Sequence, residues 1–113
     1  MFFTMFILKR RKYWITKHKG QYQIDLDRIV PDYIQFDVWS LYRFIKKRFE
    51  TKIVKKIRNA AEALWILDVK GQSISIYQDW TGVNILADDL SGESVLLEIV
   101  DQFRSSRKFI EKT

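Results

Sequence analysis

The chain has 113 residues, 47% hydrophobic and 15% aromatic, which suits one folded domain with a single core. It has no cysteine, which excludes disulfides, a thiol nucleophile and a thiolate metal site. The net charge of +6 is uneven: residues 1–58 hold 15 Lys/Arg and 5 Asp/Glu, whereas residues 59–113 hold 5 and 9. The first half is therefore basic and the second half acidic.

The chain opens on an apolar run, MFFTMFIL, which is followed by four basic residues. A secretory signal has the reverse order, and eight residues are too few for a bilayer span of ~20. We expect a buried strand here and no transmembrane segment, with an anchor on a membrane surface as the alternative. Met5 is an alternative to Met1 as the native start.

Two strands are predicted next, on either side of a turn at residues 17–20. The first covers residues 13–16, and in the second Tyr22, Ile24 and Leu26 alternate with polar residues. Pro31 then places a connector before the first helix, because a proline disfavours helix at the preceding residue.

A helix is predicted to begin at Asp37, whose carboxylate can cap the free N–H groups of the first turn. Its buried stripe is expected to consist of Val38, Leu41, Tyr42, Ile45 and Phe49. Residues 51–58, TKIVKKIR, follow almost at once. Their β-branched side chains favour a basic strand over a continuation of the helix.

Residues 64–87 predict three antiparallel strands joined by two tight turns, because apolar and polar residues alternate along them. A two-residue turn at residues 70–71 sets the register. The pairs that this register predicts are Val69 with Gln72, Leu67 with Ile74, and Trp65 with Ile76. In the second turn Asp79 stands first and Gly82 fourth, which is the type I preference. One apolar and one polar face indicate a sheet covered on one side.

The last predicted element is a helix capped by Ser91. Its buried stripe is expected to be Val95, Leu96, Ile99, Val100 and Phe103. The whole order predicts a single α+β domain over residues 1–113. It should have a mostly antiparallel sheet, a C-terminal three-stranded meander and two helices packed on one face.

Catalytic chemistry has little support in the sequence. The only histidine, His18, lies in a basic turn without a neighbouring carboxylate, so no triad is indicated. The acidic pairs at Asp25/Asp27 and Asp88/Asp89 come without histidine, and the glycines are isolated. We therefore expect no enzyme, no metal and no cofactor, with an enzyme that uses carboxylates alone as an alternative.

Positive charge is concentrated in residues 43–58. The cations there are Arg43, Lys46, Lys47, Arg48, Lys52, Lys55, Lys56 and Arg58. They form either a solvated face, which an acidic protein can bind, or a surface for a nucleic-acid backbone. Trp39 and Tyr42 lie in or beside the helix stripe and are expected in the core, although either ring could instead stack on a base.

Trp80 is the other candidate contact, because it stands in a turn between Asp79 and Thr81. It is either an exposed interface anchor or a ring folded back over the sheet edge.

Two short motifs carry a resemblance over about half of the chain. Trp65, Leu67, Asp68 and Gly71 form a W-x-L-D-x-x-G meander that resembles small proteobacterial proteins of unassigned function. The Y-x-D-W-x-G turn at residues 77–82 is similar to that of single-domain immunity proteins of contact-dependent and polymorphic toxin systems. This resemblance implies a cytoplasmic, non-catalytic protein that covers one cognate toxin. Because this chain is basic, it also implies an acidic toxin surface or contact through the acidic half.

The sequence thus predicts a non-catalytic protein-binding module of the immunity or inhibitor type. The expected contacts are the cations of residues 43–58 and Trp80. The alternative is sequence-tolerant nucleic-acid binding by the same basic segment.

Overall fold

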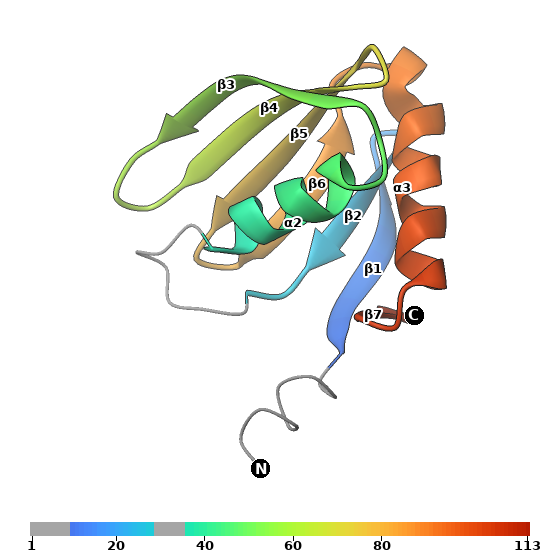
Figure 1. Ribbon diagram of the computed structural model, residues 1–113. Coiled ribbons are helices and arrows are strands. Elements are labelled where there is room, and N and C mark those ends of the chain that lie inside the picture. The colour runs from blue at the N-terminus through green and yellow to red at the C-terminus, as the bar shows by residue number, and fades with distance from the viewer. Residues whose placement is uncertain (1–9, 29–35) are drawn as a thin grey trace.

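The computed structural model describes residues 10–28 and 36–113, which form one seven-stranded sheet and two α-helices (Figure 1). The strands are β1 (Arg11–His18), β2 (Gln21–Leu26), β3 (Thr51–Arg58), β4 (Ala63–Val69), β5 (Gln72–Asp79), β6 (Gly82–Ala87) and β7 (Phe109–Lys112). The helices are α2 (Phe36–Lys46) and α3 (Glu93–Ser105), with a 3-10 turn η1 (Leu90–Gly92) before α3.

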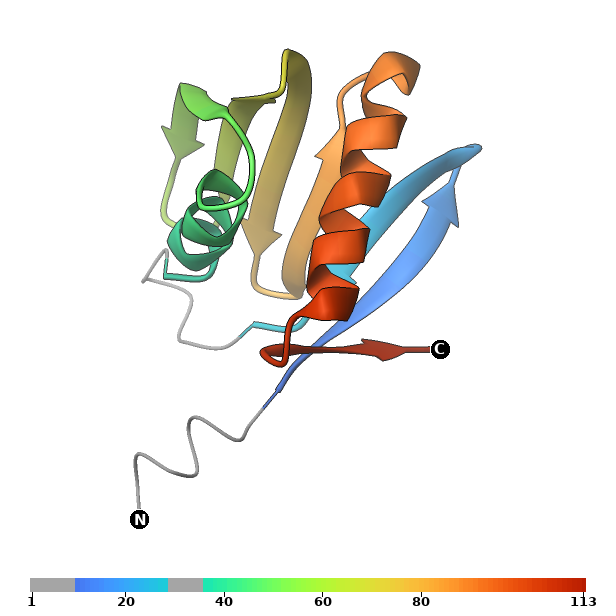
Figure 2. The same cartoon turned by 45° about the vertical axis from the view of Figure 1, so that its right-hand side comes forward.

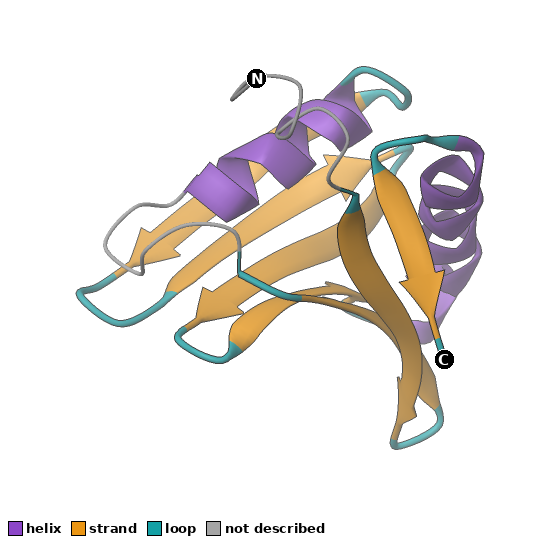
Figure 3. Cartoon of the chain, turned by 90° about the horizontal axis from the view of Figure 1, so that it is seen from below, coloured by secondary structure: helices purple, strands orange, loops and turns teal. Residues whose placement is uncertain are grey.

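The strand order is β3-β4-β5-β6-β2-β1-β7, and every pair is antiparallel except β1 with β7. Both helices lie on the same face of the sheet (Figure 2): α2 packs on β5 and β3, and α3 packs on β2, β6 and β7. The predicted α+β class is confirmed. The sheet is larger than predicted, because β7 returns along β1 as a seventh strand (Figure 3).

The predicted register of the β4–β5 hairpin is confirmed, with Val69 opposite Gln72 and Trp65 opposite Ile76. Lys70 and Gly71 have φ values of 54° and 84°, so the turn is one of the primed hairpin types. A type I turn requires negative φ values at its two central residues. Neither Trp80 nor Thr81 has a positive φ, so the second turn meets this requirement.

The core lies between the sheet and the helices. The stripe of α3 is buried as predicted, and so are Val38, Leu41 and Ile45 of α2. The meander residues that face the helices are also buried: Trp65, Leu67, Val69, Ile74, Ile76, Val83, Ile85 and Ala87.

An aromatic cluster fills the core beside α3. Phe103 stacks on Phe109 with ring centroids 4.2 Å apart, and Phe44 and Tyr13 meet Phe103 edge-on at 5.1 Å and 5.2 Å. Burial, together with a 3.0 Å hydrogen bond to Glu111, raises the pKa of Tyr13 to about 12. The cluster joins both helices to β1 and β7.

Three predictions about the helices are wrong. α2 begins at Phe36, so Asp37 lies inside its first turn and not at the cap. Ser91 does not cap α3, because it lies in η1, where Asp89 is the cap. Trp39, which was expected in the core, is 42% exposed, whereas the adjacent Val38 is buried.

The predicted strand at residues 1–8 and the connector at Pro31 fall outside the described residues. No helix in residues 10–28 or 36–113 is long and apolar enough to cross a membrane.

Gly82, the first residue of β6, lies close against the main chain of Leu26 in β2. A Cβ atom at this position would lie 2.8 Å from the carbonyl oxygen of Leu26, which is closer than such atoms tolerate. We expect Gly82→Ala to lower the free energy of unfolding by about 1–3 kcal/mol in urea denaturation, because the two backbones must separate. Ser94→Ala, at an exposed position of α3, is the control. Equal losses in the two variants would contradict the close approach.

Candidate functional site

β3 is one of the two edge strands of the described sheet, since β4 is the one strand paired with it there. Seven of its eight residues are exposed, and it carries four cations and no acid. We call these four residues the basic edge: Lys52, Lys55, Lys56 and Arg58. Sequence analysis proposed all four as contacts, and the structure places them on one strand.

A β-bulge divides the basic edge, because the register shifts between Ile53 and Lys55. Lys52 lies opposite Asp68 and Lys55 opposite Ile66, on the face turned away from the helices. Lys56 lies opposite the inward-facing Trp65, and Arg58 lies opposite the buried Ala63, on the helix side. The edge therefore offers cations above and below the sheet.

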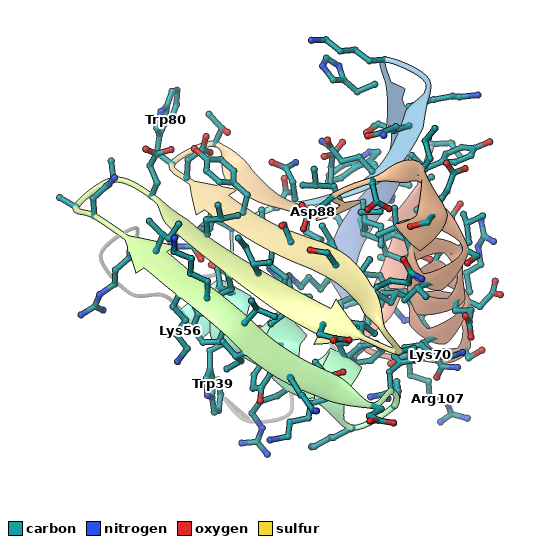
Figure 4. The ribbon with its side chains drawn as sticks, turned by 90° about the horizontal axis from the view of Figure 1, so that it is seen from above. Trp39, Lys56, Lys70, Trp80, Asp88 and Arg107 are labelled. Atoms are coloured by element: carbon teal, nitrogen blue, oxygen red, sulfur yellow. The ribbon has the colours of Figure 1, made fainter. Side chains whose placement is uncertain are left out.

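Three aromatic rings, two on α2 and one on β4, each contact a cation of residues 43–58. The rings of Tyr42 and Trp65 lie 5.7 Å apart, and Lys56 lies 4.2 Å from the centre of the Trp65 ring. The amine of Lys46 lies 5.6 Å from Tyr42, and the guanidinium of Arg43 lies 4.9 Å from Trp39. We call this group the aromatic strip, and its rings already carry cations of the same chain. Trp39 and Lys56 both project past β3 (Figure 4).

The remaining two cations of the predicted segment differ in role. Arg48 lies 3.6 Å from the centre of the Phe44 ring and donates a 3.1 Å hydrogen bond to the carbonyl oxygen of Phe44. Arg48 therefore supplies a hydrogen bond to one of the main-chain carbonyl groups at the end of α2, which lack a partner within the helix. Lys47 is exposed just after α2.

Trp80 is 75% exposed, so of the two alternatives that the sequence left open, the folded-back ring is wrong and the exposed ring is the one found. Asp79 fixes its turn, because its Oδ1 accepts 2.9 Å and 2.5 Å hydrogen bonds from the N–H and hydroxyl of Thr81. These bonds hold the pKa of Asp79 below its usual value. Arg58, Ala63 and Gln78 lie in one row across β3, β4 and β5, so Trp80 stands at the end of the sheet where Arg58 lies.

The sheet face away from the helices carries hydrogen-bonded acids. Asp25 accepts hydrogen bonds from Thr16, Gln23 and Asn84, which lie on three strands. Asp88 accepts from Ser73 and, at 2.7 Å, from Ser75. These contacts come from strand pairing and had no signal in the sequence.

Another hydrogen bond on this face ties β5 to the turn between β3 and β4. Tyr77 donates to Glu62, and this bond raises the pKa of Tyr77 to about 12. The phenol therefore stays neutral over the physiological range.

A buried ion cluster anchors the start of α2. Asp37 is 0% exposed and accepts 2.9 Å hydrogen bonds from Arg11 of β1 and from Arg28, which follows β2. Arg28 also donates a 2.9 Å bond to the carbonyl oxygen of Asp79. Burial lowers the pKa of Arg11 to about 10, with Asp37 opposing this shift.

Other candidate chemistry is sparse in the described residues. His18 is exposed at the end of β1, opposite Gln21. Within residues 10–28 and 36–113, no three His, Asp or Glu side chains gather as metal ligands would. A polar hollow of about 170 Å³ lies between Glu50, Lys52 and Lys70, below the ~300 Å³ at which small-molecule pockets usually begin.

Comparisons of this chain with protein-family models, with curated proteins and with solved structures find no match. The resemblance to immunity proteins therefore stays a prediction.

Sequence analysis missed that β3 is an edge strand and that Ile53, Val54 and Ile57 are exposed. One signal was present, because TKIVKKIR lacks the alternation of apolar and polar residues seen in the meander. Cations on both faces and a bulge are typical of edge strands.

Proposed function

We propose that this chain is a non-catalytic, cytoplasmic protein-binding module of the immunity or inhibitor type, which neutralises a toxin by covering it. The observation that carries this proposal is the mixed character of the basic edge. Between its cations, Ile53, Val54 and Ile57 are 37%, 65% and 43% exposed. Apolar side chains surrounded by charged ones are typical of surfaces that bind proteins.

The charge of the edge indicates an acidic partner surface. Complementary charges speed the encounter of two proteins, while a few apolar or aromatic anchors supply most of the affinity. Trp80 is such an anchor and lies at the same end of the sheet as Arg58. A partner that covers this end contacts both.

The alternative function is sequence-tolerant nucleic-acid binding by residues 43–58, whose cations also suit phosphates. Such binding usually adds stacking of bases on exposed aromatic rings. Trp65 is only 5% exposed and carries Lys56, and Tyr42 is half-buried and carries Lys46. Trp39 is 42% exposed but carries Arg43. Because each ring of the aromatic strip already holds a cation of the same chain, the strip favours a protein partner.

The test is a double charge reversal, Lys47→Glu with Lys55→Glu. The partner is captured from the source cell after nuclease treatment, and its affinity for each variant is measured by calorimetry. We expect the dissociation constant to rise about 10- to 100-fold, because two attractive charges become repulsive. If the partner is a toxin, co-expression of the wild type should restore growth and the double variant should not.

Arg107→Glu with Lys108→Glu is the matched control. It changes net charge equally, just before β7 at the opposite edge of the sheet, and should bind as the wild type does. An unchanged dissociation constant for the Lys47/Lys55 variant would show that the cations of residues 43–58 do not contact the partner. Oligonucleotide binding at low salt that weakens steeply as salt is added would instead support the alternative function.

A further inference from the structure

The main chain of β3 has hydrogen-bonding groups that β4 does not use. The N–H of Asn59 donates a 3.0 Å bond to Glu62, so Asn59 faces β4. In an antiparallel pair, successive residues direct their main-chain groups alternately toward and away from the partner strand. Lys55 and Ile57 therefore face β4, whereas Lys56 and Arg58 direct their N–H and C=O groups outward.

The same alternation holds before the bulge. The N–H of Lys70 donates a 2.9 Å bond to the carbonyl oxygen of Glu50, so Glu50 faces β4. Thr51 and Ile53 therefore face outward. Exposed main-chain groups along an edge strand are a template on which another extended chain can pair.

The side chains of β3 select what can pair there. A second copy of β3 would bring its four cations against the four already present, which repels self-association. An extended segment with Asp or Glu would instead oppose cations on both faces of the strand. Its apolar residues would meet Ile53 and Ile57, which are exposed.

We infer that β3 binds an extended, acidic segment of its partner as an added strand, held by the outward main-chain groups of Thr51, Ile53, Lys56 and Arg58. This inference rests on the proposed function as a protein binder and specifies how the partner is held. The cations set the sequence preference, and the main-chain hydrogen bonds supply the pairing.

The probe is a library of random dodecapeptides displayed on phage and selected on the immobilised wild-type protein. The selected peptides should be richer in Asp and Glu than the starting library, with β-branched residues between them. In the complex with a selected peptide, NMR should show at least tenfold slower exchange of the Lys56 and Arg58 amides. The Lys55 and Ile57 amides should already be protected in the free protein.

A matched pair of variants separates main-chain pairing from charge. Lys56→Ala and Lys56→Pro both remove the amine, but only proline also removes the outward N–H, a change that edge strands tolerate. We expect Lys56→Pro to bind the selected peptide at least tenfold more weakly than Lys56→Ala. If Lys56→Pro does not fold, the amide exchange of the wild type decides the question.

Equal binding by the two Lys56 variants would overturn the inference. The inference would also be overturned if the selected peptides were not acidic, or if no peptide were selected. It would fail as well if the bound peptide slowed amide exchange on another surface and not at Lys56 and Arg58. If the captured partner loses affinity for the Lys47/Lys55 charge reversal but not for Lys56→Pro, strand addition fails while the proposed function stands. If neither change weakens binding of the partner, both strand addition and the role of the basic edge in the proposed function fail.

Discussion

Replacing Asp37 by asparagine should lower the free energy of unfolding by about 3–5 kcal/mol, because it removes the buried carboxylate to which two largely buried guanidinium groups donate. Asp37 is 0% exposed, and the side chains of Arg11 and Arg28 are each 10% exposed. The carboxylate also lies in the first turn of α2, where the helix dipole favours negative charge. Urea denaturation of the variant and the wild type measures the loss.

Glu98→Gln is the control for this prediction, because it breaks the exposed pair between Lys70 and Glu98, whose side chains are both 45% exposed. Such a pair contributes at most about 1 kcal/mol. Adding Arg11→Met to Asp37→Asn should recover part of the loss, since one uncompensated charge disappears. A loss for Asp37→Asn no larger than that for Glu98→Gln would show that water or another group replaces the carboxylate.

Phe103→Ala should cost about 3–5 kcal/mol of unfolding free energy, because the ring is fully buried and its removal leaves a cavity that the rigid sheet cannot fill. The ring contacts Tyr13 of β1, Phe44 of α2 and Phe109 of β7. The loss should therefore spread beyond α3, and the amides of β7 should exchange faster with solvent. Urea denaturation and hydrogen exchange together check both parts.

Leu97→Ala lies on the same helix and removes a residue that is 40% exposed. It should cost only about 1 kcal/mol, because Leu97 is only partly buried and no enclosed cavity is left behind. Phe103→Leu should fall between the two, since it retains part of the buried volume. Similar losses for Phe103→Ala and Leu97→Ala would mean that the cluster collapses around the missing ring.

The local parts of the fold could be predicted from the sequence. Trp65, Leu67 and Val69 alternate with polar or half-buried residues, and a two-residue turn leaves one register in which these three share a face with Ile74 and Ile76. The stripes of the helices were equally clear. These elements are specified by neighbours in the sequence, so their pattern is visible without the structure.

Long-range pairings could not be predicted. β7 has four residues, too few for a recognisable alternation, and it becomes a strand because β1 is there to pair with it. Arg11 and Arg28 look like ordinary surface cations in the sequence, yet both turn inward to Asp37. Their burial depends on where β1, β2 and α2 meet.

The candidate site shows the same division. Composition located the cations of residues 43–58, but the strand order decides which of them share a surface. Arg48 lies over Phe44 and donates a hydrogen bond to a carbonyl at the end of α2, whereas Lys55 and Lys56 project from opposite faces of an edge strand. Periodicity within β3 could not show that β4 is its one partner among the described strands.

The parallel pairing of β1 with β7 has a mechanical consequence. Arg11 lies opposite Phe109, and Trp14 lies opposite Lys112, so the two strands run side by side in the same direction. A force that pulls Arg11 and Lys112 apart along the strands therefore acts in shear. It loads the hydrogen bonds of this ladder together, whereas an antiparallel pair pulled from one end opens one bond at a time. Resistance to stretching in this direction is thus set by the shortest strand of the sheet.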